Sequence, residues 1–276
     1  MTDMIVDANS LFARSWFAAQ RIEPDPAQAI RLAVNTVLLL LNPDTNRIGS
    51  NFDRLLFCWD GAQKPDKGRS EKPPEYHPTK DLLREVFTVM FGAAHAEHPH
   101  YEGDDLVATA VGNSKADRIY VVSGDKDLMQ LQTAAHIFYY CLNTKAVLST
   151  AFINQKWHIK RPSHVSIALA IIGDPVDNIS GIHGWGPKKV QKLFTDITPD
   201  MDFATVLEII DDKIPEEHKP DFYESLEKTI LNFDVPGVPD PAPIVWASMQ
   251  DVADLGLPNV DNIYRECYAV YNDAPY

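Results

Sequence analysis

The stretch Ile119-Tyr120-Val121-Val122-Ser123-Gly124-Asp125-Lys126-Asp127 begins as a β-branched and aromatic run and ends in a glycine and two aspartates. Such a run predicts a strand buried on both faces, as in a parallel sheet. Runs of the same character occupy residues 4–6, 55–59 and 136–140, with helix-like stretches at 27–41, 79–91 and 106–113. Strands that alternate with helices predict an α/β fold with a mostly parallel central sheet flanked by helices.

Acidic residues stand at the turn points of the chain, several of them directly after these predicted strands. They are Asp7, Asp60, Glu102, Asp104, Asp105, Asp125, Asp127, Asp174 and Asp177. Ligand sites in open α/β sheets form outside the carboxyl ends of the strands, so we expect these carboxylates to converge on one crevice. Gathered negative charges oppose one another strongly, and bound divalent cations would relieve that repulsion.

The composition is that of a folded globular protein. The chain has 276 residues, of which 45% are hydrophobic and 10% aromatic. Its net charge of −14 would ordinarily argue against a polyanionic partner. That argument is weak here, because the nine candidate ligands supply much of the excess. The basic residues therefore matter by their position rather than by their total.

The three cysteines, Cys58, Cys141 and Cys267, lack the spacing of a metal site. An odd number suits no closed disulfide framework, which favours a reducing cytoplasmic compartment. No targeting signal or bilayer-spanning run is visible, so we expect a cytoplasmic protein with no membrane partner. As a separate expectation, we take the protein to be a monomer.

Changes in the predicted secondary-structure pattern and in composition divide the chain into three parts. Residues 1–160 carry the alternating pattern of an α/β core and include a basic segment at 61–91. Residues 161–234 read as helical, with a helix predicted from Val165 to Ile172 and another from Pro187 to Phe194. Residues 235–276 have no assigned role, and their Pro-rich beginning at 236–243 reads as a connector.

The basic segment contains Lys64, Lys67, Arg69 and Lys72 among several prolines. This composition cannot pack a core and predicts a loop that leads into a helix. A long exposed loop within a compact domain is usually functional or disordered.

A Gly-rich hairpin lies in the helical part. It reads Gly181-Ile182-His183-Gly184-Trp185-Gly186, and Pro187 suits the first position of the helix that follows. Gly184 and Gly186 would let the backbone approach a phosphate, and Lys188, Lys189 and Lys192 would add salt-sensitive affinity for phosphates. The alternative is a plain Gly-rich turn before a basic surface helix.

These motifs, taken in order, resemble the 5′-nuclease family: phage 5′–3′ exonucleases and flap endonucleases, and the 5′-nuclease domain of bacterial DNA polymerase I. The resemblance runs from Ile5 to about Phe194. It rests on Val6-Asp7-Ala8-Asn9-Ser10 with Arg14, Trp59-Asp60-Gly61, Pro74-Glu75-Tyr76, Glu102-Gly103-Asp104-Asp105, Ser123-Gly124-Asp125-Lys126-Asp127, Gly173-Asp174-Pro175-Val176-Asp177-Asn178-Ile179 and the hairpin. One such motif is a weak signal, whereas the ordered set is specific.

The resemblance implies a PIN-like nuclease core with a helix–hairpin–helix region, and hydrolysis of DNA phosphodiester bonds from or near 5′ ends. Substrates would be DNA with 5′ ends, flaps or nicks, and RNA–DNA hybrids. Two Mg²⁺ ions would serve as cofactors, with Mn²⁺ as a substitute, and relatives suggest K⁺ at the hairpin. The first metal site would use Asp7, Asp60, Glu102, Asp104, Asp105 and Asp125. The second would use Asp127, Asp174 and Asp177, with Asp125 between the two.

The basic segment matches the position of the helical arch of these nucleases. By this resemblance the arch side chains would meet phosphates and Tyr76 would stack on a base; the basic ones are Lys67, Arg69, Lys72, Lys80 and Arg84. The chain departs from the family pattern at His77 and Lys80, where relatives carry Lys and Arg. Lys80 and Arg84 remain the candidates for stabilising transition-state charge, and Arg14 is a candidate phosphate contact.

Other interpretations stay open. Asp104 and Asp105 suit the first turn of a helix, and Asp60 suits a turn. A haloacid-dehalogenase-like phosphatase would need an acid where Asn9 stands, and a non-cleaving DNA-binding module would need broken acids. No Ser-His-Asp system and no phosphate loop for ATP is present, and His95, His98 and His100 have loop-like spacing.

Overall fold

A mostly parallel β-sheet forms the centre of the protein. The computed structural model describes residues 1–22, 25–46, 48–63, 72–257 and 260–272. The sheet has the order β3-β2-β1-β4-β5-β6, with β7 paired to β2 off this path. Its strands are β1 (Thr2–Asp7), β2 (Arg54–Trp59), β3 (Ala94–Glu97), β4 (Arg118–Ser123), β5 (Ile137–Cys141), β6 (Ala146–Leu148) and β7 (Ala242–Pro243). The first five run parallel, whereas β6 and β7 are antiparallel to their neighbours, so the predicted α/β fold with a mostly parallel sheet is confirmed.

Side chains of the central strands alternate between two hydrophobic clusters. On β1, Met4 and Val6 belong to one cluster and Ile5 to the other. On β4, Tyr120 belongs to the cluster of Met4 and Val6, and Ile119 belongs to the cluster of Ile5. Because successive side chains of a strand point to opposite faces, both faces of the sheet are covered, as parallel sheets require.

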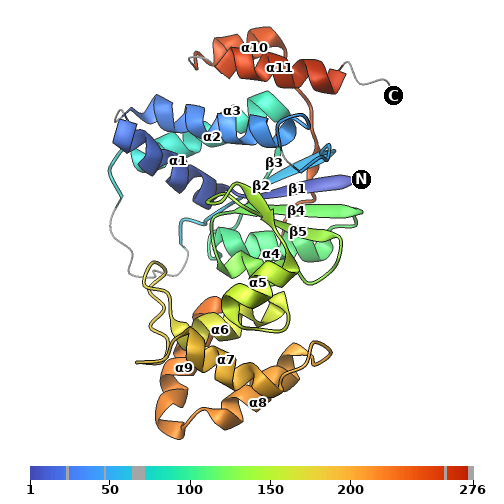
Figure 1. Cartoon of the computed structure of the whole chain (residues 1–276). Helices are drawn as coiled ribbons and strands as arrows, with labels where there is room; N and C mark the ends of the chain where they lie inside the picture. Colours follow the sequence, from blue (N-terminus) through green and yellow to red (C-terminus); the bar gives the residue numbers. More distant parts are fainter. Residues whose placement is uncertain (23–24, 47, 64–71, 258–259, 273–276) are drawn as a thin grey trace.

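Helices cover both faces of the sheet (Figure 1). One face carries α1 (Ala8–Ile22), α2 (Pro26–Leu41) and α3 (Tyr76–Phe91), and the other carries α4 (Gly103–Asn113). Outside α2 and α3 lie α10 (Met249–Asp254) and α11 (Val260–Asn272). The C-terminal part therefore packs on the α/β core, a location that its sequence did not indicate.

The helical part lies on the α4 side of the sheet (Figure 1). It contains α6 (Val165–Ile172), α7 (Pro187–Leu193), α8 (Phe203–Lys213) and α9 (Lys219–Thr229), with 3₁₀ turns η2 (Pro162–His164), η3 (Phe194–Asp196) and η4 (Glu216–His218). The predicted helix at residues 165–172 is confirmed, and the one expected from Pro187 ends one residue earlier than predicted.

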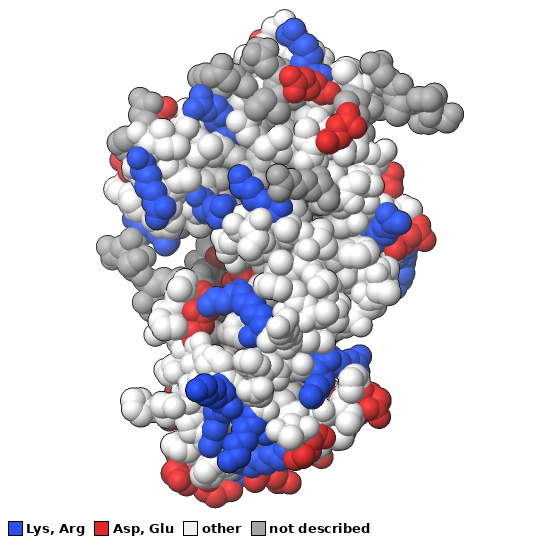
Figure 2. All heavy atoms as spheres, in the orientation of Figure 1, with Lys and Arg blue, Asp and Glu red and all other residues white. Residues whose placement is uncertain are grey.

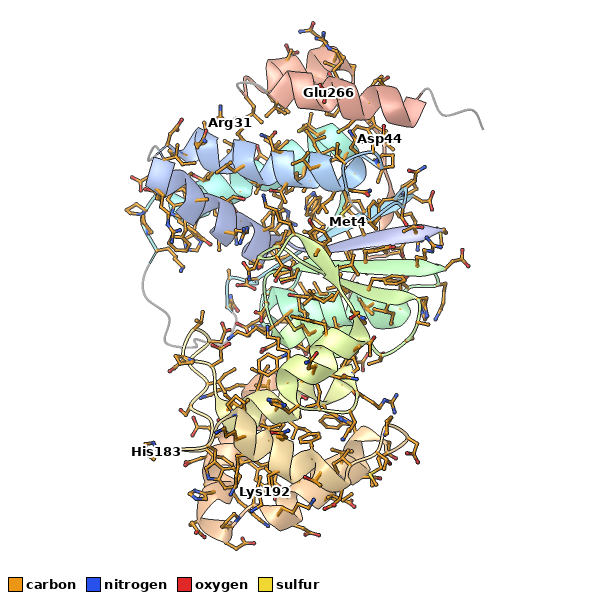
Figure 3. All side chains as sticks on the ribbon, in the orientation of Figure 1. Met4, Arg31, Asp44, His183, Lys192 and Glu266 are labelled. Atoms are coloured by element: carbon orange, nitrogen blue, oxygen red, sulfur yellow. The ribbon has the colours of Figure 1, made fainter. Side chains whose placement is uncertain are left out.

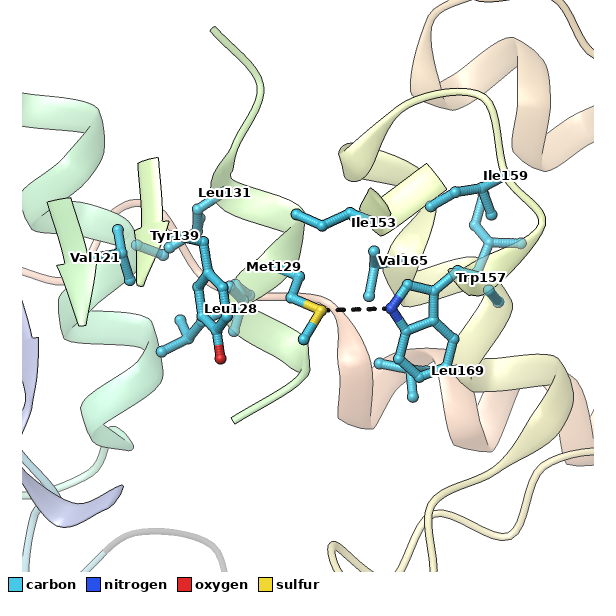
Figure 4. Close-up of a cluster of buried hydrophobic side chains, with 14 of the residues drawn as sticks. Val121, Leu128, Met129, Leu131, Tyr139, Ile153, Trp157, Ile159, Val165 and Leu169 are labelled. Carbon is cyan, nitrogen blue, oxygen red and sulfur yellow. Dashed lines mark hydrogen bonds between the residues drawn. The ribbon is translucent and has the colours of Figure 1, made fainter. Parts of the chain in front are cut away.

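One hydrophobic cluster joins the sheet to this helical part. The 3₁₀ helix η1 (Asp127–Leu131) and α5 (Thr150–Trp157) lie between them, and the indole N–H of Trp157 donates to the sulfur of Met129 over 3.5 Å (Figure 4). The cluster continues to Val190 on α7 and Phe222 on α9. The helical part that begins near residue 161 therefore shares one hydrophobic cluster with the sheet, and it has no separate core among the described residues.

None of the described helices combines the length and the apolar character needed to cross a membrane.

Candidate active site

Three acidic residues follow the carboxyl ends of three adjacent strands. Asp7 ends β1, Asp60 follows β2, and Asp125 lies in the loop after β4. Strand β1 lies between β2 and β4, with Asp7 opposite Cys58 and Val6 opposite Val122. The sheet register therefore brings these three acids to the same edge, as the sequence predicted.

Asp7 is the buried centre of this group. Its Oδ1 accepts the Ser10 N–H over 3.0 Å and its Oδ2 accepts the Ser123 hydroxyl over 2.6 Å. Burial raises the pKa of Asp7 to about 7, the two hydrogen bonds lower it, and the charges of Asp125 and Asp60 raise it further. The pocket thus disfavours a bare Asp7 carboxylate, the condition that a nearby cation would relieve.

Asp60 is linked to the start of α4. The Gly103 N–H donates to Oδ1 of Asp60 over 2.8 Å. A Cβ on Gly103 would lie 3.0 Å from Nδ2 of Asn9 and 3.3 Å from Oδ1 of Asp60, so glycine permits this close approach. Glu102, which precedes Gly103, is the N-cap residue of α4 and is buried.

The loop after β4 is held by hydrogen bonds that the sequence did not reveal. Asp125 Oδ1 accepts the Asp127 N–H over 3.0 Å, and the Asp125 N–H donates to the Ser123 hydroxyl over 2.9 Å. The Tyr139 hydroxyl, from β5, donates to the carbonyl oxygens of Ser123 and Asp125. Ser123 and Tyr139 therefore position the acids, and only a knowledge of strand pairing would have identified Tyr139.

The turn after α6 brings a further acid to the site. Asp174 is 1% exposed, its Oδ1 accepts the Val176 N–H over 3.1 Å, and its Oδ2 forms an ion pair with Nζ of Lys126. Lys126 belongs to the loop after β4, so this ion pair joins the two acidic loops. Asn178, in the same turn, has a left-handed backbone with φ of 55°. Asp177 lies in the same turn and is half-buried.

The two acids of the first turn of α4 have local partners. Asp104 Oδ1 accepts the Asp105 N–H over 2.8 Å, and Asp105 Oδ1 accepts the Asn232 N–H over 2.8 Å. Asp105 thus anchors the loop that follows α9. A structural role for Asp105, an alternative that its position also allowed, has direct support here.

The nine predicted ligands do not form one ready-made metal site. Within the described ranges, no three acidic, histidine or cysteine side chains are arranged to hold a metal ion. Two of the nine have partners outside the strand ends, since Asp174 pairs with Lys126 and Asp105 accepts the Asn232 N–H. The donor chemistry still suits a hard divalent cation, since Asp7, Asp60 and Asp125 offer carboxylate oxygens at one sheet edge.

Tyr76 corrects one prediction about the basic segment. Its ring is 7% exposed and packs edge-on against Phe12 at 4.8 Å and Trp16 at 5.4 Å. The predicted stacking of Tyr76 on a base is therefore wrong, since this ring joins α3 to α1. Lys67 and Arg69 lie outside the described residues. Lys72 lies over the Phe17 and Tyr76 rings, at 5.2 and 5.7 Å.

The other predicted cations have varied surroundings. Arg84 forms an ion pair with Glu97 at the end of β3, so phosphate binding by Arg84 requires that pair to open. The Arg14 guanidinium donates to Oδ1 of Asn143 over 2.7 Å, and Nδ2 of Asn143 donates to the Gly124 carbonyl, which places Arg14 beside the acidic loop. Lys80 is half-buried on α3.

The Gly-rich hairpin lies between α6 and α7. Gly173 and Gly181 pack so closely that a Cβ on Gly181 would lie 2.4 Å from the Gly173 nitrogen. A Cβ on Gly184 or Gly186, by contrast, would have no neighbouring atom within 4 Å, so the backbone at these two glycines faces open space. Gly173 and Gly181 are therefore required for packing, whereas the two glycines predicted to contact DNA, Gly184 and Gly186, have free space around them.

Basic side chains gather around the hairpin. Lys188 and Lys192 on α7 are exposed, and Lys189 lies over the Trp185 ring at 4.0 Å. Figure 2 shows a group of Lys and Arg side chains at the end of the molecule that contains α7, with acidic side chains along the rim of the same end. In Figure 3, His183 and Lys192 lie at this end, far from Glu266 on α11.

Comparisons with known proteins give a consistent result. Residues 2–158 match the family described as 5′-3′ exonuclease, N-terminal resolvase-like domain. The chain is 24% identical over 254 residues to DNA polymerase I of Bacillus subtilis, covering 87% of the chain and 28% of that protein. It is 26% identical over 194 residues to a 5′-3′ exonuclease of Mycoplasmopsis pulmonis, covering 69% of the chain and 65% of that protein.

A solved structure of the T5 5′-exonuclease with bound zinc has a similar fold. The TM-score is 0.58 at 17% identity, and the match covers 97% of the chain and 98% of the T5 protein. The chain spans less than a third of the length of the DNA polymerase I that it matches.

Proposed function

The chain belongs to the family of 5′-3′ exonucleases with an N-terminal resolvase-like domain, and from this premise we propose that it is a structure-selective 5′ nuclease. It hydrolyses DNA phosphodiester bonds at or near 5′ ends, as an exonuclease, a flap endonuclease or both. The observation that carries the proposal is the placement of Asp7, Asp60 and Asp125 at the carboxyl ends of three adjacent strands.

Divalent metal ions, Mg²⁺ in the cell, are part of the proposal. Asp7, Asp60, Glu102, Asp104 and Asp125 would hold one ion, and Asp127, Asp174 and Asp177 would contribute to a second. When bound, such ions supply a nucleophilic water and neutralise charge on the phosphate. The raised pKa of Asp7 supports this assignment, because a bound cation would offset the burial, and the charges of Asp125 and Asp60, that disfavour the carboxylate.

The protein side chains would bind and orient the DNA. Ser123 and Ser10 hold the Asp7 carboxylate in one orientation, and Tyr139 holds the loop of Asp125. Arg14, exposed beside that loop, is placed to contact a backbone phosphate. Such charge-assisted contacts position the scissile bond without reading the bases.

The hairpin and α7 would grip the duplex part of the substrate. The open backbone at Gly184 and Gly186 and the exposed Lys188 and Lys192 suit phosphate contacts that are independent of sequence. Binding of K⁺ at this hairpin, cleavage of RNA–DNA hybrids and a monomeric state are parts of the same proposal.

The decisive experiment compares Asp125→Asn with wild type on 5′-flap, nicked, blunt and RNA-primed substrates in Mg²⁺. We expect turnover to fall at least about 100-fold, while binding in Ca²⁺ changes little. Asp212→Asn, which neutralises an exposed acid on α8, serves as the matched control. Full activity of the Asp125 variant would contradict the site, and wild-type binding without cleavage would indicate a DNA-binding module instead.

A further inference from the structure

One face of α1 begins at the acidic site and stays exposed. Leu11, Phe12, Ser15, Trp16 and Ala19 are buried against the core. At 100° per residue, Ser10, Arg14, Phe17 and Arg21 share the opposite face, since they follow one another at three- and four-residue intervals.

The near end of this face touches the catalytic loop. The Ser10 hydroxyl accepts the Gly124 N–H over 2.9 Å, and Arg14 reaches the same loop through Asn143. From Asp7, a rise of 1.5 Å per residue puts Phe17 about 15 Å further along the helix. This exposed face of α1 therefore extends along the surface away from the acids.

Phe17 is an unusual residue for the exposed face of a helix. Its ring is 48% exposed, although a phenylalanine gains free energy when it is removed from water. Basic groups surround it: Nζ of Lys72 lies 5.2 Å from the ring centroid, and Arg14 and Arg21 flank it along the same face. An exposed ring among cations is the combination that binds single-stranded nucleic acid by base stacking and phosphate contacts.

Tyr76 holds this arrangement in place. Its buried ring packs on Phe12 and Trp16, which fixes the start of α3 against α1. Lys72, four residues before Tyr76, is thereby kept beside Phe17. Tyr76, which was predicted to stack on DNA, therefore has a structural role. It holds Lys72 beside the exposed ring of Phe17.

We propose that Phe17, flanked by Arg14, Arg21 and Lys72, is a stacking platform for the unpaired nucleotides that extend from the scissile phosphate at the 5′ end. The ligand is a nucleobase with its adjacent backbone phosphates, in single-stranded form. The proposal rests on the proposed nuclease function for the identity of the strand. It adds a means by which an unpaired 5′ extension is distinguished from a blunt or nicked end.

The test compares Phe17→Ala with Phe152→Ala, which removes an equally exposed ring, 47% exposed, from α5. Binding is measured in Ca²⁺ by anisotropy, on one duplex with and without a 5′ oligothymidine extension. Because a stacked base contributes about 1–3 kcal/mol, Phe17→Ala should weaken binding of the extended duplex about 5- to 150-fold. Binding of the blunt duplex should change less than about twofold, Phe17→Trp should retain wild-type affinity, and Phe152→Ala should leave both affinities unchanged.

A second measurement separates stacking from folding. 2-Aminopurine, placed in turn at each of the first unpaired positions, should be quenched by wild type at one position and not by Phe17→Ala. Equal loss of affinity on both duplexes, no loss at all, or a fall in melting temperature that parallels the loss would overturn the platform. If wild type binds the extension through Phe17 but cleaves nothing in Mg²⁺, the platform stands and the proposed nuclease function falls.

Discussion

The hydroxyl of Ser123 on β4 donates a 2.6 Å hydrogen bond to Oδ2 of Asp7 on β1. This bond crosses between two adjacent parallel strands at their carboxyl ends, where the chain also places Asp60 and Asp125. Ser123 holds the carboxylate in one orientation, yet burial and like charge still raise its pKa. A site that orients an acid while disfavouring its charge is poised to bind a cation, at a cost in stability when none is present.

Asp7→Asn should therefore stabilise the metal-free protein while it abolishes activity. Because the pKa of Asp7 is raised from 3.8 to about 7 in the folded state, stability from this group is present below pH 3.8 and is lost as the pH rises through 7. The variant should be more stable than wild type by about 2–4 kcal/mol at pH 7.5, and by roughly half as much at pH 5. Urea unfolding in EDTA measures both values.

Two controls make the Asp7 result specific. Asp212→Asn removes an exposed acid and should change the free energy of unfolding by less than about 0.5 kcal/mol. Added Ca²⁺ should stabilise wild type more than Asp7→Asn, because the ligand that binds it is absent in the variant. A variant less stable than wild type at pH 7.5 would show that burial and like charge do not disfavour the Asp7 carboxylate.

Lys126→Met should make the protein more dependent on divalent ions. Lys126 is the cation that pairs with the buried Asp174 carboxylate. Its loss should destabilise the metal-free protein by about 1–3 kcal/mol, below the range for fully buried pairs because Lys126 is partly exposed. Mn²⁺ should then raise the melting temperature more in this variant than in wild type.

The double variant Lys126→Met with Asp174→Asn tests the cause. Removing both charges should recover most of the lost stability, since no buried charge is left unpaired. It should also remove the extra response to Mn²⁺. If the double variant stays as unstable as the single one, the ion pair is not what Lys126 contributes.

The sheet and its acidic edge could be predicted because they follow from local pattern. The β-branched run at 119–122 became β4, and the acids after β1, β2 and β4 met at one edge because parallel strands align their carboxyl ends. Helix α1 was not predicted, although Leu11, Phe12, Ser15, Trp16 and Ala19 have helical spacing and would have indicated it. Strand β3 offers no such signal, because Ala94-His95-Ala96-Glu97 is a strand only through its pairing with β2.

Side-chain partners could not be predicted from the sequence. Lys126 reaches Asp174 and Asp105 reaches Asn232 across long sequence separations, so their pairing depends on the packing of the helical part against the sheet. Tyr76 looked like an exposed arch residue, but its burial depends on Phe12 and Trp16 of an unpredicted helix. Tertiary packing, not local preference, decides these positions.

His164→Leu should reduce the sensitivity of the fold to acid. His164 is buried before α6, and its ring nitrogens have no hydrogen-bond partner among the described residues. Burial, and to a lesser extent the charge of Arg161, lowers its pKa from 6.5 to about 4. The unfolded state therefore binds a proton first, and stability from this group is lost as the pH falls from 6.5 towards 4.

The expected size of the His164 effect is about 2 kcal/mol between pH 7.5 and pH 5 in wild type. That component should be absent from His164→Leu, while the opposite contribution of Asp7 remains in both proteins. His136→Leu, at an exposed position, controls for loss of a histidine. Parallel pH profiles of wild type and His164→Leu would contradict the assignment.

Lys188→Ala should weaken DNA binding without changing catalysis of bound substrate. Lys188 is exposed on α7 beside the open backbone of Gly184 and Gly186, a position suited to a phosphate contact. Loss of one such contact should reduce the slope of log K against log salt by about 0.9 on duplex DNA. Lys115→Ala is the matched control, since Lys115 is also exposed but precedes β4, at the sheet edge opposite the acids. A salt slope that falls equally in both variants would mean that the protein binds DNA through diffuse charge, and that the hairpin makes no localised contact.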